Sequence, residues 1–280
     1  MTRVRNLVKS TLRMVIGVER TYRVSWWAYD LLAWSVTTLH PAARRSSREF
    51  EQLKDTHRGE RCFILGNGPS LNETDLSLLL GEQTFGQNRV YLLFDRIGFA
   101  TTYLVCTNPL VMEQWGHEMA STPSKKFFLW RGRRFLPPRD DILFFQYRSR
   151  PHFADSPVPY GLGSGATVTY AAMQLAYHMG FSEVILVGVD HYFATTGPSY
   201  TVVVSPEDDP NHFDPSYFGR GTRWELPDLE ASELAYRRAK ARFEADGRRI
   251  LDATIGGNLT VFPKVAYSAL FKETKHSSDA

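Results

Sequence analysis

Cys62-Phe-Ile-Leu-Gly-Asn-Gly-Pro-Ser-Leu71 is the stretch that decides the fold class of this 280-residue chain. Its first four residues are typical of a buried strand, which the following glycines end at once. A strand that ends in glycines and a hydroxyl residue presents backbone N–H groups at the carboxyl edge of a sheet, where α/β proteins bind phosphates. The turn also fits a plain strand–helix connection stabilised by Asn67, and both interpretations remain open here.

Strands alternate with helices along the rest of the chain. Besides 62–65, we expect strands at 90–94, 103–106, 126–129, 142–145, 184–187 and 249–251, and helices after Leu71 and at 166–179 and 229–246. This alternation predicts an α/β fold, a Rossmann-like, mostly parallel sheet flanked by helices. Residues 193–227 form a long insertion, rich in proline from 197 onward, that we expect to be an active-site lid or disordered.

The chain divides at residue 57 into a basic, tryptophan-rich helical extension (1–57) and the Rossmann-like domain (58–280). The apolar stretch 24–37 is too short to span a membrane and is interrupted by Asp30. It lacks the cleavage site of a signal peptide. Basic clusters around Trp26, Trp27 and Trp34 favour a helix on an anionic membrane surface, whereas the alternative is packing on the domain or on a second subunit. We expect a cytoplasmic protein, peripheral on the inner face of the membrane.

Composition argues against several other classes of protein. A net charge of +3 without a basic stripe gives no support for nucleic-acid binding. Cys62 and Cys106 both lie in apolar runs, so we expect reduced core cysteines rather than a disulfide or a metal site.

Polar residues gather where the predicted strands end, so the fold would bring them to one edge of the sheet. They are Asn67, Gly68 and Ser70, then Asn88, Asn108, Ser164 and Gly165, and last Asp190, His191 and Tyr192. The N–H groups of Gly165 and Ala166 at a helix start would form an anion site. Asp190 and His191 at a strand end are candidate catalytic groups, although Asp190 could instead cap the next turn.

Several of these motifs together resemble two related families. The motifs are 66–71, Asn108-Pro109, 163–165 and 179–190, and the resemblance covers roughly residues 61–259. One family is the bacterial sialyltransferases of glycosyltransferase family 42. The other is the 6-hydroxymethylpterin diphosphokinase-like family, which includes the motility-associated-factor flagellin glycosyltransferases.

The sialyltransferase resemblance implies a CMP-sugar donor that the residues of these motifs hold without a required metal. It implies that Asn67 and Ser70 contact the donor phosphate and ribose. Asn88 and Asn108 would face the cytosine or its ribose, Ser164 with Gly165 the base or carboxylate, and Asp190 with Tyr192 would line the same cleft.

One motif departs from that family. A Tyr-x-Gly-His pattern supplies its phosphate-binding tyrosine and catalytic histidine, whereas this chain has Tyr217-Phe-Gly-Arg220. An arginine stays protonated and cannot act as a general base, although Arg220 could stabilise a departing phosphate. We therefore expect His212 to be the base, with His191 and Asp190 as competitors.

Three functions follow from these observations. The first is a glycosyltransferase that moves an acidic sugar, such as sialic acid or a related nonulosonate, from CMP to a glycan or glycolipid. The second is a pyrophosphokinase that uses ATP and Mg²⁺, for which Asp208 and Asp209 are a candidate metal-binding pair. The third is a non-catalytic nucleotide-binding protein of a glycan-assembly complex.

Overall fold

A seven-stranded sheet forms the centre of the molecule in the computed structural model, which describes residues 31–32, 35, 39–148 and 152–271. The strand order is β5-β4-β3-β2-β1-β6-β9, and every neighbouring pair is parallel. The strands are β1 (Arg61–Leu65), β2 (Thr84–Gln87), β3 (Tyr103–Cys106), β4 (Lys125–Leu129), β5 (Ile142–Phe145), β6 (Glu183–Val187) and β9 (Arg249–Asp252). The predicted Rossmann-like α/β class is therefore confirmed.

The direction of strand addition reverses at β1. From β1 the chain adds β2, β3, β4 and β5 on one side, then returns to add β6 and β9 on the other. In β1 only the first residue is partly exposed, as expected for a strand covered on both faces. In open α/β sheets, the crevice beyond the strand ends at such a reversal is the usual ligand site.

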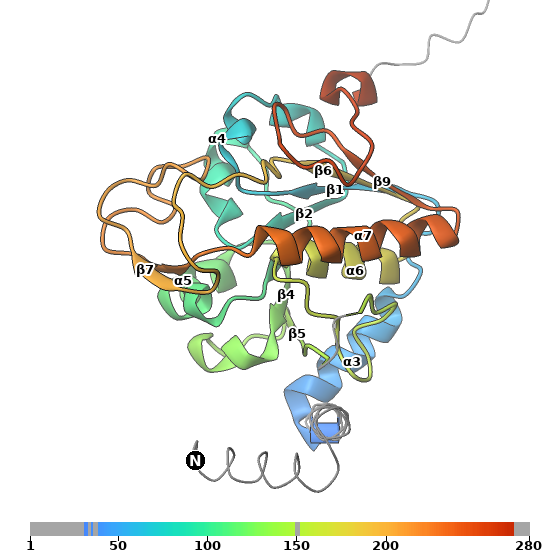
Figure 1. The fold of residues 1–280 in the computed structure, drawn as a ribbon. Coiled ribbons are helices and arrows are strands. Elements are labelled where there is room, and N and C mark those ends of the chain that lie inside the picture. The colour runs from blue at the N-terminus through green and yellow to red at the C-terminus, as the bar shows by residue number, and fades with distance from the viewer. Residues whose placement is uncertain (1–30, 33–34, 36–38, 149–151, 272–280) are drawn as a thin grey trace, which may run out of the picture.

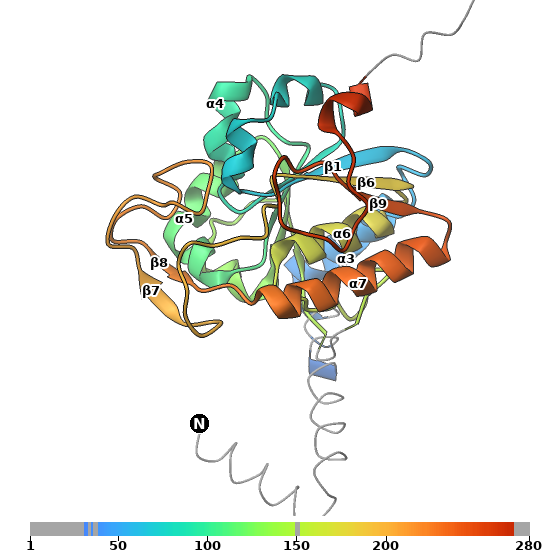
Figure 2. The same ribbon diagram turned by 45° about the horizontal axis from the view of Figure 1, so that its top comes forward.

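Helices cover both faces of the sheet (Figures 1 and 2). One face carries α3 (Pro41–Leu53), α6 (Val168–His178) and α7 (Leu229–Ala245), and the other carries α4 (Phe94–Ile97) and the 3₁₀ turns η1 (Pro69–Asn72), η2 (Leu76–Leu79) and η5 (Tyr267–Phe271). Three further elements belong to the connections between strands. Turn η3 (Val90–Leu93) follows β2, helix α5 (Pro109–Ser121) connects β3 to β4, and turn η4 (Trp130–Phe135) connects β4 to β5.

Helix α3 falls in the predicted N-terminal extension but packs on the sheet. The ring centroids of Phe50 and of Phe127 in β4 lie 5.6 Å apart. The Ser46 hydroxyl accepts a hydrogen bond from the Phe144 N–H at 2.9 Å. The α/β body thus includes residues from Pro41 onward. The tryptophans of the predicted membrane segment lie outside the described residues. No helix in the described part of the chain has the length and apolarity needed to cross a membrane.

Two predicted elements differ in the structure. Residues 90–94 are not a strand: η3 spans Val90–Leu93, and the strand is β2, just upstream. Val90 and Leu93, three positions apart, are both buried, which matches the period of a 3₁₀ turn. The expected helix after Leu71 is instead two short turns, η1 and η2, and Asp75 caps the second of them.

The insertion is folded over the carboxyl edge of the sheet. It contains a two-stranded antiparallel sheet of β7 (Val202–Val204) and β8 (Arg223–Glu225). The Phe218 ring stacks on the Trp115 ring of α5 with centroids 5.8 Å apart, and the Trp224 ring stacks on Phe218 at 5.5 Å, so aromatic residues fix the insertion to the body. The insertion is therefore ordered, and the alternative expectation of disorder is wrong.

Candidate functional site

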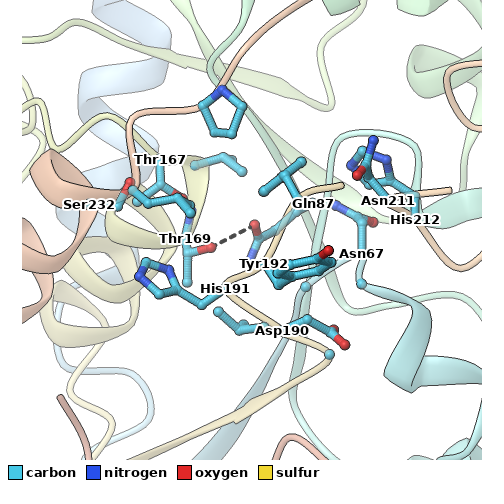
Figure 3. Close-up of a pocket in the computed structure, with 18 of the residues that line it drawn as sticks. Asn67, Gln87, Thr167, Thr169, Asp190, His191, Tyr192, Asn211, His212 and Ser232 are labelled. Carbon is cyan, nitrogen blue, oxygen red and sulfur yellow. Dashed lines mark hydrogen bonds between the residues drawn. The ribbon is translucent and has the colours of Figure 1, made fainter. Parts of the chain in front are cut away.

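A cavity of about 170 Å³ lies at the carboxyl ends of β1, β2 and β6, where the strand order reverses (Figure 3). We call it the inner cavity. The turn after β1 (66–68) and the turn after β6 (188–190) form part of its wall, and the starts of α6 and α7 form another part. Its place is the one at which doubly wound sheets bind ligands.

The two turns touch, and glycines allow this. A Cβ atom at Gly66 would lie 2.1 Å from the carbonyl oxygen of Gly188, and one at Gly68 would lie 1.6 Å from Asp190 Oδ2. The N–H groups of Gly66 and Gly68 donate to Val187 and Gly188 at 2.8 and 2.9 Å. These N–H groups are therefore committed to β6 and its turn, and they do not form the free phosphate cradle expected from sequence.

Ser70 holds Asp190 in place. Its hydroxyl donates to Asp190 Oδ2 at 2.8 Å and its N–H to Oδ1 at 3.2 Å. Ser70 is 4% exposed and lies outside the cavity lining, so the expected contact of Ser70 with the ligand is corrected to a contact with Asp190. Burial raises the pKa of the Asp190 carboxyl above its ordinary value, although both hydrogen bonds from Ser70 act to lower it.

Three amide side chains line the inner cavity and leave a buried atom without a hydrogen bond inside the described residues. These atoms are Asn67 Oδ1, Gln87 Nε2 and Asn88 Oδ1. Buried amide groups are nearly always paired in folded proteins. Three unpaired groups around one cavity therefore indicate a ligand that forms hydrogen bonds with them. Sequence reasoning identified Asn67 and Asn88 and missed Gln87.

Helix α6 begins later than the sequence indicated. Its first residue is Val168, and the Thr167 side chain caps it by accepting from the Thr169 N–H. Ser164 is exposed and does not line the inner cavity. Gly165 is a packing residue, since a Cβ there would lie 2.3 Å from the Tyr170 ring. The predicted anion site therefore shifts from Ser164 and Gly165 to the N–H groups at the true helix start.

Backbone strain collects around the inner cavity. Asn88, Ala166 and His191 all line it, and their φ angles are +49°, +61° and +55°. Residues with a side chain rarely adopt this left-handed conformation, which costs free energy unless the surroundings impose it. Such outliers are typical of functional sites.

A second cavity of about 650 Å³, the outer cavity, adjoins the first over the carboxyl ends of β2 to β5. Asn88, Ala166, Thr167, Val168, Phe193, His212 and Pro227 line both cavities, which therefore form one continuous cleft. Ser164 and Asn108 lie in the outer cavity. Asn108 caps α5 by accepting from the Leu110 N–H at 2.8 Å, and its amide donates to Glu225 at 3.1 Å.

Buried Arg89 anchors the insertion beside the cleft. Its guanidinium donates to the carbonyl oxygens of Ser216, at 2.8 Å, and of Tyr217. The guanidinium carbon also lies 4.2 Å from the centre of the Trp115 ring. A second anchor joins the Phe213 N–H to the Asn67 carbonyl oxygen at 2.9 Å. These contacts hold the insertion on the β1 and β2 turns.

His212 stands where the two cavities meet. Its Nδ1 lies 2.7 Å from Asp209 Oδ2, and the Asp209 carboxylate also accepts from the N–H groups of Asn211 and Phe218 at 2.8 and 3.0 Å. Burial raises the pKa of the Asp209 carboxyl, but the hydrogen bond and charge of His212 and the two N–H groups outweigh it and lower the pKa overall. A carboxylate paired with the Nδ1 of a histidine leaves Nε2 as the basic nitrogen. That is the arrangement of a general base.

The other predicted residues occupy different places. His191 lines the inner cavity, where its Nε2 lies 3.2 Å from Glu233 Oε1, and Tyr192 is 61% exposed at the rim. Tyr217 is fully buried and lines neither cavity. Arg220 is exposed and also lines neither, so the structure does not bring it to the site.

The candidate metal pair does not form. The Asp209 carboxylate is occupied by His212 and by backbone N–H groups, whereas Asp208 is exposed. In the described residues, no three His, Cys, Asp or Glu side chains form a group that could hold a metal ion.

We compared the chain with known families, curated proteins and solved structures. No protein-family model matches the sequence. A search of curated proteins also finds no match. Among solved structures, a MAf glycosyltransferase from Magnetospirillum magneticum AMB-1 superposes with a TM-score of 0.47 and 15% identity, over 82% of this chain and 39% of that chain. The chain thus spans about two fifths of that protein's length. A likeness of this degree assigns neither a family nor an activity.

Proposed function

We propose that this protein is a glycosyltransferase that moves a sugar from a nucleotide-linked donor to a glycan or glycolipid acceptor. The observation that carries the proposal is the position of the His212–Asp209 pair at the junction of two cavities. Group transfer requires two substrates to meet at one base, and a two-part cleft with the base at the junction suits that requirement.

The inner cavity suits the donor. It lies at the reversal of strand order, where nucleotides bind in α/β sheets. Its unpaired amides, Asn67, Gln87 and Asn88, offer hydrogen bonds to a polar ligand. The resemblance of the motifs to the sialyltransferases makes a CMP-linked acidic sugar, such as sialic acid or a related nonulosonate, the donor that we propose.

The outer cavity suits the acceptor. It is larger, and its lining includes the exposed cations Arg131 and Arg134 beside the exposed apolar residues Tyr200 and Val202. The polar groups of a glycan or glycolipid could bind to the two arginines. The apolar chain of a glycolipid could contact Tyr200 and Val202. The exposed side chains belong to η4 and to the insertion.

His212 would activate the acceptor. Its Nε2 takes the proton of the acceptor hydroxyl, whose oxygen forms a bond to the anomeric carbon of the sugar. The bond from that carbon to the phosphate oxygen breaks, and the nucleotide leaves with the electron pair. Asp209 stabilises the imidazolium that forms, as the acid does in other carboxylate–histidine pairs. N–H groups at the α6 start are suited to the charge that develops on the phosphate.

A ligand screen tests the proposal. Thermal shifts are measured with CMP, UDP, GDP, ADP and their sugar conjugates, each with and without Mg²⁺, because a bound nucleotide raises the melting temperature by mass action. We expect the largest shift with cytidine compounds and no requirement for metal. A shift with ATP and Mg²⁺ and none with CMP would instead favour the pyrophosphokinase. Donor binding without hydrolysis or transfer would indicate the non-catalytic assembly protein.

We further propose that residues 1–40 bind an anionic membrane surface on the cytoplasmic side. Support comes from the basic clusters around Trp26, Trp27 and Trp34. Such binding would hold the protein near glycolipid acceptors.

A further inference from the structure

Gln87, the last residue of β2, carries an amide whose two ends are used differently. Its Oε1 accepts a hydrogen bond from the Thr169 hydroxyl at 3.0 Å, which Figure 3 draws as a dashed line. Its Nε2 is buried and has no hydrogen-bond acceptor in the described part of the chain. The residue is 2% exposed and lines the inner cavity. With the amide oxygen paired to the Thr169 hydroxyl in this way, the NH₂ group is the end left for a ligand.

The amide of Gln87 lies beside the start of α6, since Thr169 belongs to the first turn of that 11-residue helix. The N–H groups of Thr167 and Val168 also lie there and have no acceptor within residues 39–148 and 152–271. The first N–H groups of a helix carry the positive end of its dipole. This wall of the inner cavity therefore offers hydrogen-bond donors.

The wall formed by the β1 and β6 turns has the opposite character. It presents Asn67 Oδ1, which has no donor in the described residues, and it includes Asp190, whose two carboxyl oxygens accept hydrogen bonds from Ser70. Asn67 Oδ1 is an acceptor and Asp190 is an anion when ionised, so that wall suits hydroxyl groups and repels anions. A ligand with an anionic end and a hydroxyl-bearing end would therefore bind in one orientation.

We propose that Gln87 is a specificity-determining residue that donates a hydrogen bond to an anionic oxygen of the ligand, seated at the start of α6. The anion is a phosphate or a carboxylate. An unpaired buried donor costs free energy that only an acceptor can recover, and an anion is the strongest acceptor. The identity of the ligand as a nucleotide-linked acidic sugar rests on the proposed function, and both anions occur in that molecule.

The test uses two near-isosteric substitutions in the full-length protein. Gln87→Glu keeps the oxygen that accepts from Thr169 but replaces the donor by a charge that repels anions, and Gln87→Met removes both polar atoms. Gln52→Glu, at an exposed position of α3, is the matched control for the change in charge. Melting of each unliganded variant verifies folding.

Binding is measured by calorimetry with inorganic phosphate, N-acetylneuraminate, cytidine, CMP and CMP-N-acetylneuraminate. We expect at least one anionic probe to bind the native protein, and to bind Gln87→Glu at least tenfold more weakly. Gln87→Met should also weaken the binding, and Gln52→Glu should leave it unchanged. Loss with phosphate and CMP identifies the phosphate as the anion, whereas loss only with the two sugar acids identifies the carboxylate.

Three results would overturn the assignment of Gln87. The first is native-like binding of every probe by Gln87→Glu and Gln87→Met. The second is a Gln87→Glu variant that binds cytidine and CMP with equally weakened affinity. The third is failure of every anionic probe to bind the native protein. Failure of the proposed function has a different signature. In that case an anion binds in a Gln87-dependent manner, but cytidine and its compounds bind no more tightly than the simple anions do.

Discussion

The imidazole of His212 lies face to face with the phenol ring of Tyr217, with ring centroids 4.0 Å apart and planes inclined by 10°. The Asp209 carboxylate meets the edge of the same imidazole. Stacking fixes the plane of the ring and the carboxylate fixes its rotation, so the direction of Nε2 is set before any substrate binds. Tyr217, fully buried, therefore serves as a platform for His212 rather than as a ligand contact.

Substitution of Arg89 should loosen the insertion. Arg89→Met removes charged donors from the carbonyl oxygens of Ser216 and Tyr217 and should lower the free energy of unfolding by about 2 kcal/mol or more. Chemical denaturation measures this loss, and limited proteolysis should show earlier cleavage within 193–227. Arg220→Met, at an exposed position of the insertion, is the control. Equal stability of the two variants would contradict the anchoring role.

The sequence predicts the sheet and its functional edge but not the pairing of side chains. The apolar runs locate most strands, and Gly66 and Gly68 mark the edge where ligands bind. Strand β2 is not predicted because Thr84–Gln87 contains only one large apolar residue. For the same reason Gln87 is not predicted to lie at the end of a strand. The shift of the α6 start depends on the left-handed conformation of Ala166, which no local sequence rule requires.

The pair His212 and Asp209, which we propose to be catalytic, could also be predicted only in part. His212 could be nominated because it is a histidine in the insertion. Its partner Asp209 could not be identified as one, since the sequence equally allowed Asp208 and Asp209 to bind a metal ion. The choice is made by the fold of the insertion, which brings the N–H of Phe218 to Asp209 and the ring of Tyr217 under His212.

Substitution of Gly66 should be costly. In Gly66→Ala the new methyl group would lie 2.1 Å from a carbonyl oxygen of the neighbouring turn, which must move away from β1. We expect a loss of about 3 kcal/mol in the free energy of unfolding, at the upper end for overpacking. Gly219→Ala, whose Cβ would meet no atom closer than 3.4 Å, should change stability by less than about 0.5 kcal/mol. Denaturant titration of both variants decides, and similar losses would contradict the close approach of the turns.

Asp190→Asn should stabilise the protein at neutral pH. The folded-state pKa of Asp190 is raised by burial above its ordinary value of 3.8, so ionisation of this group opposes folding. The penalty is complete above the folded-state pKa and vanishes as the pH falls toward 3.8, where both states bind the proton. The melting temperature of the variant should therefore exceed that of the native protein at pH 7, and the difference should shrink on acidification. Asp208→Asn, at an exposed position, controls for the loss of one charge. A constant difference across the pH range would contradict the assignment.

Membrane association should depend on the residues before α3. The full-length protein should float with vesicles that contain anionic lipid, less at high salt, because its basic clusters are screened. A chain that begins at His40 keeps α3 and its contacts with the sheet, and it should not float. Equal flotation of the two proteins, or none of either, would mean that the segment is a packing element.

The last prediction concerns the base. His212→Ala should lower turnover by roughly 10²-fold or more and leave donor affinity nearly unchanged, because the imidazole acts on the acceptor proton. Asp209→Asn should also lower turnover, since an amide cannot stabilise the imidazolium as a carboxylate does. Donor hydrolysis and transfer rates are compared with donor affinity from calorimetry, and His117→Ala, at an exposed position of α5, is the control. His191 is the competitor because it also lines the inner cavity, but its Nε2 already faces Glu233. Near-full turnover of His212→Ala together with an inactive His191→Ala would move the base to the end of β6.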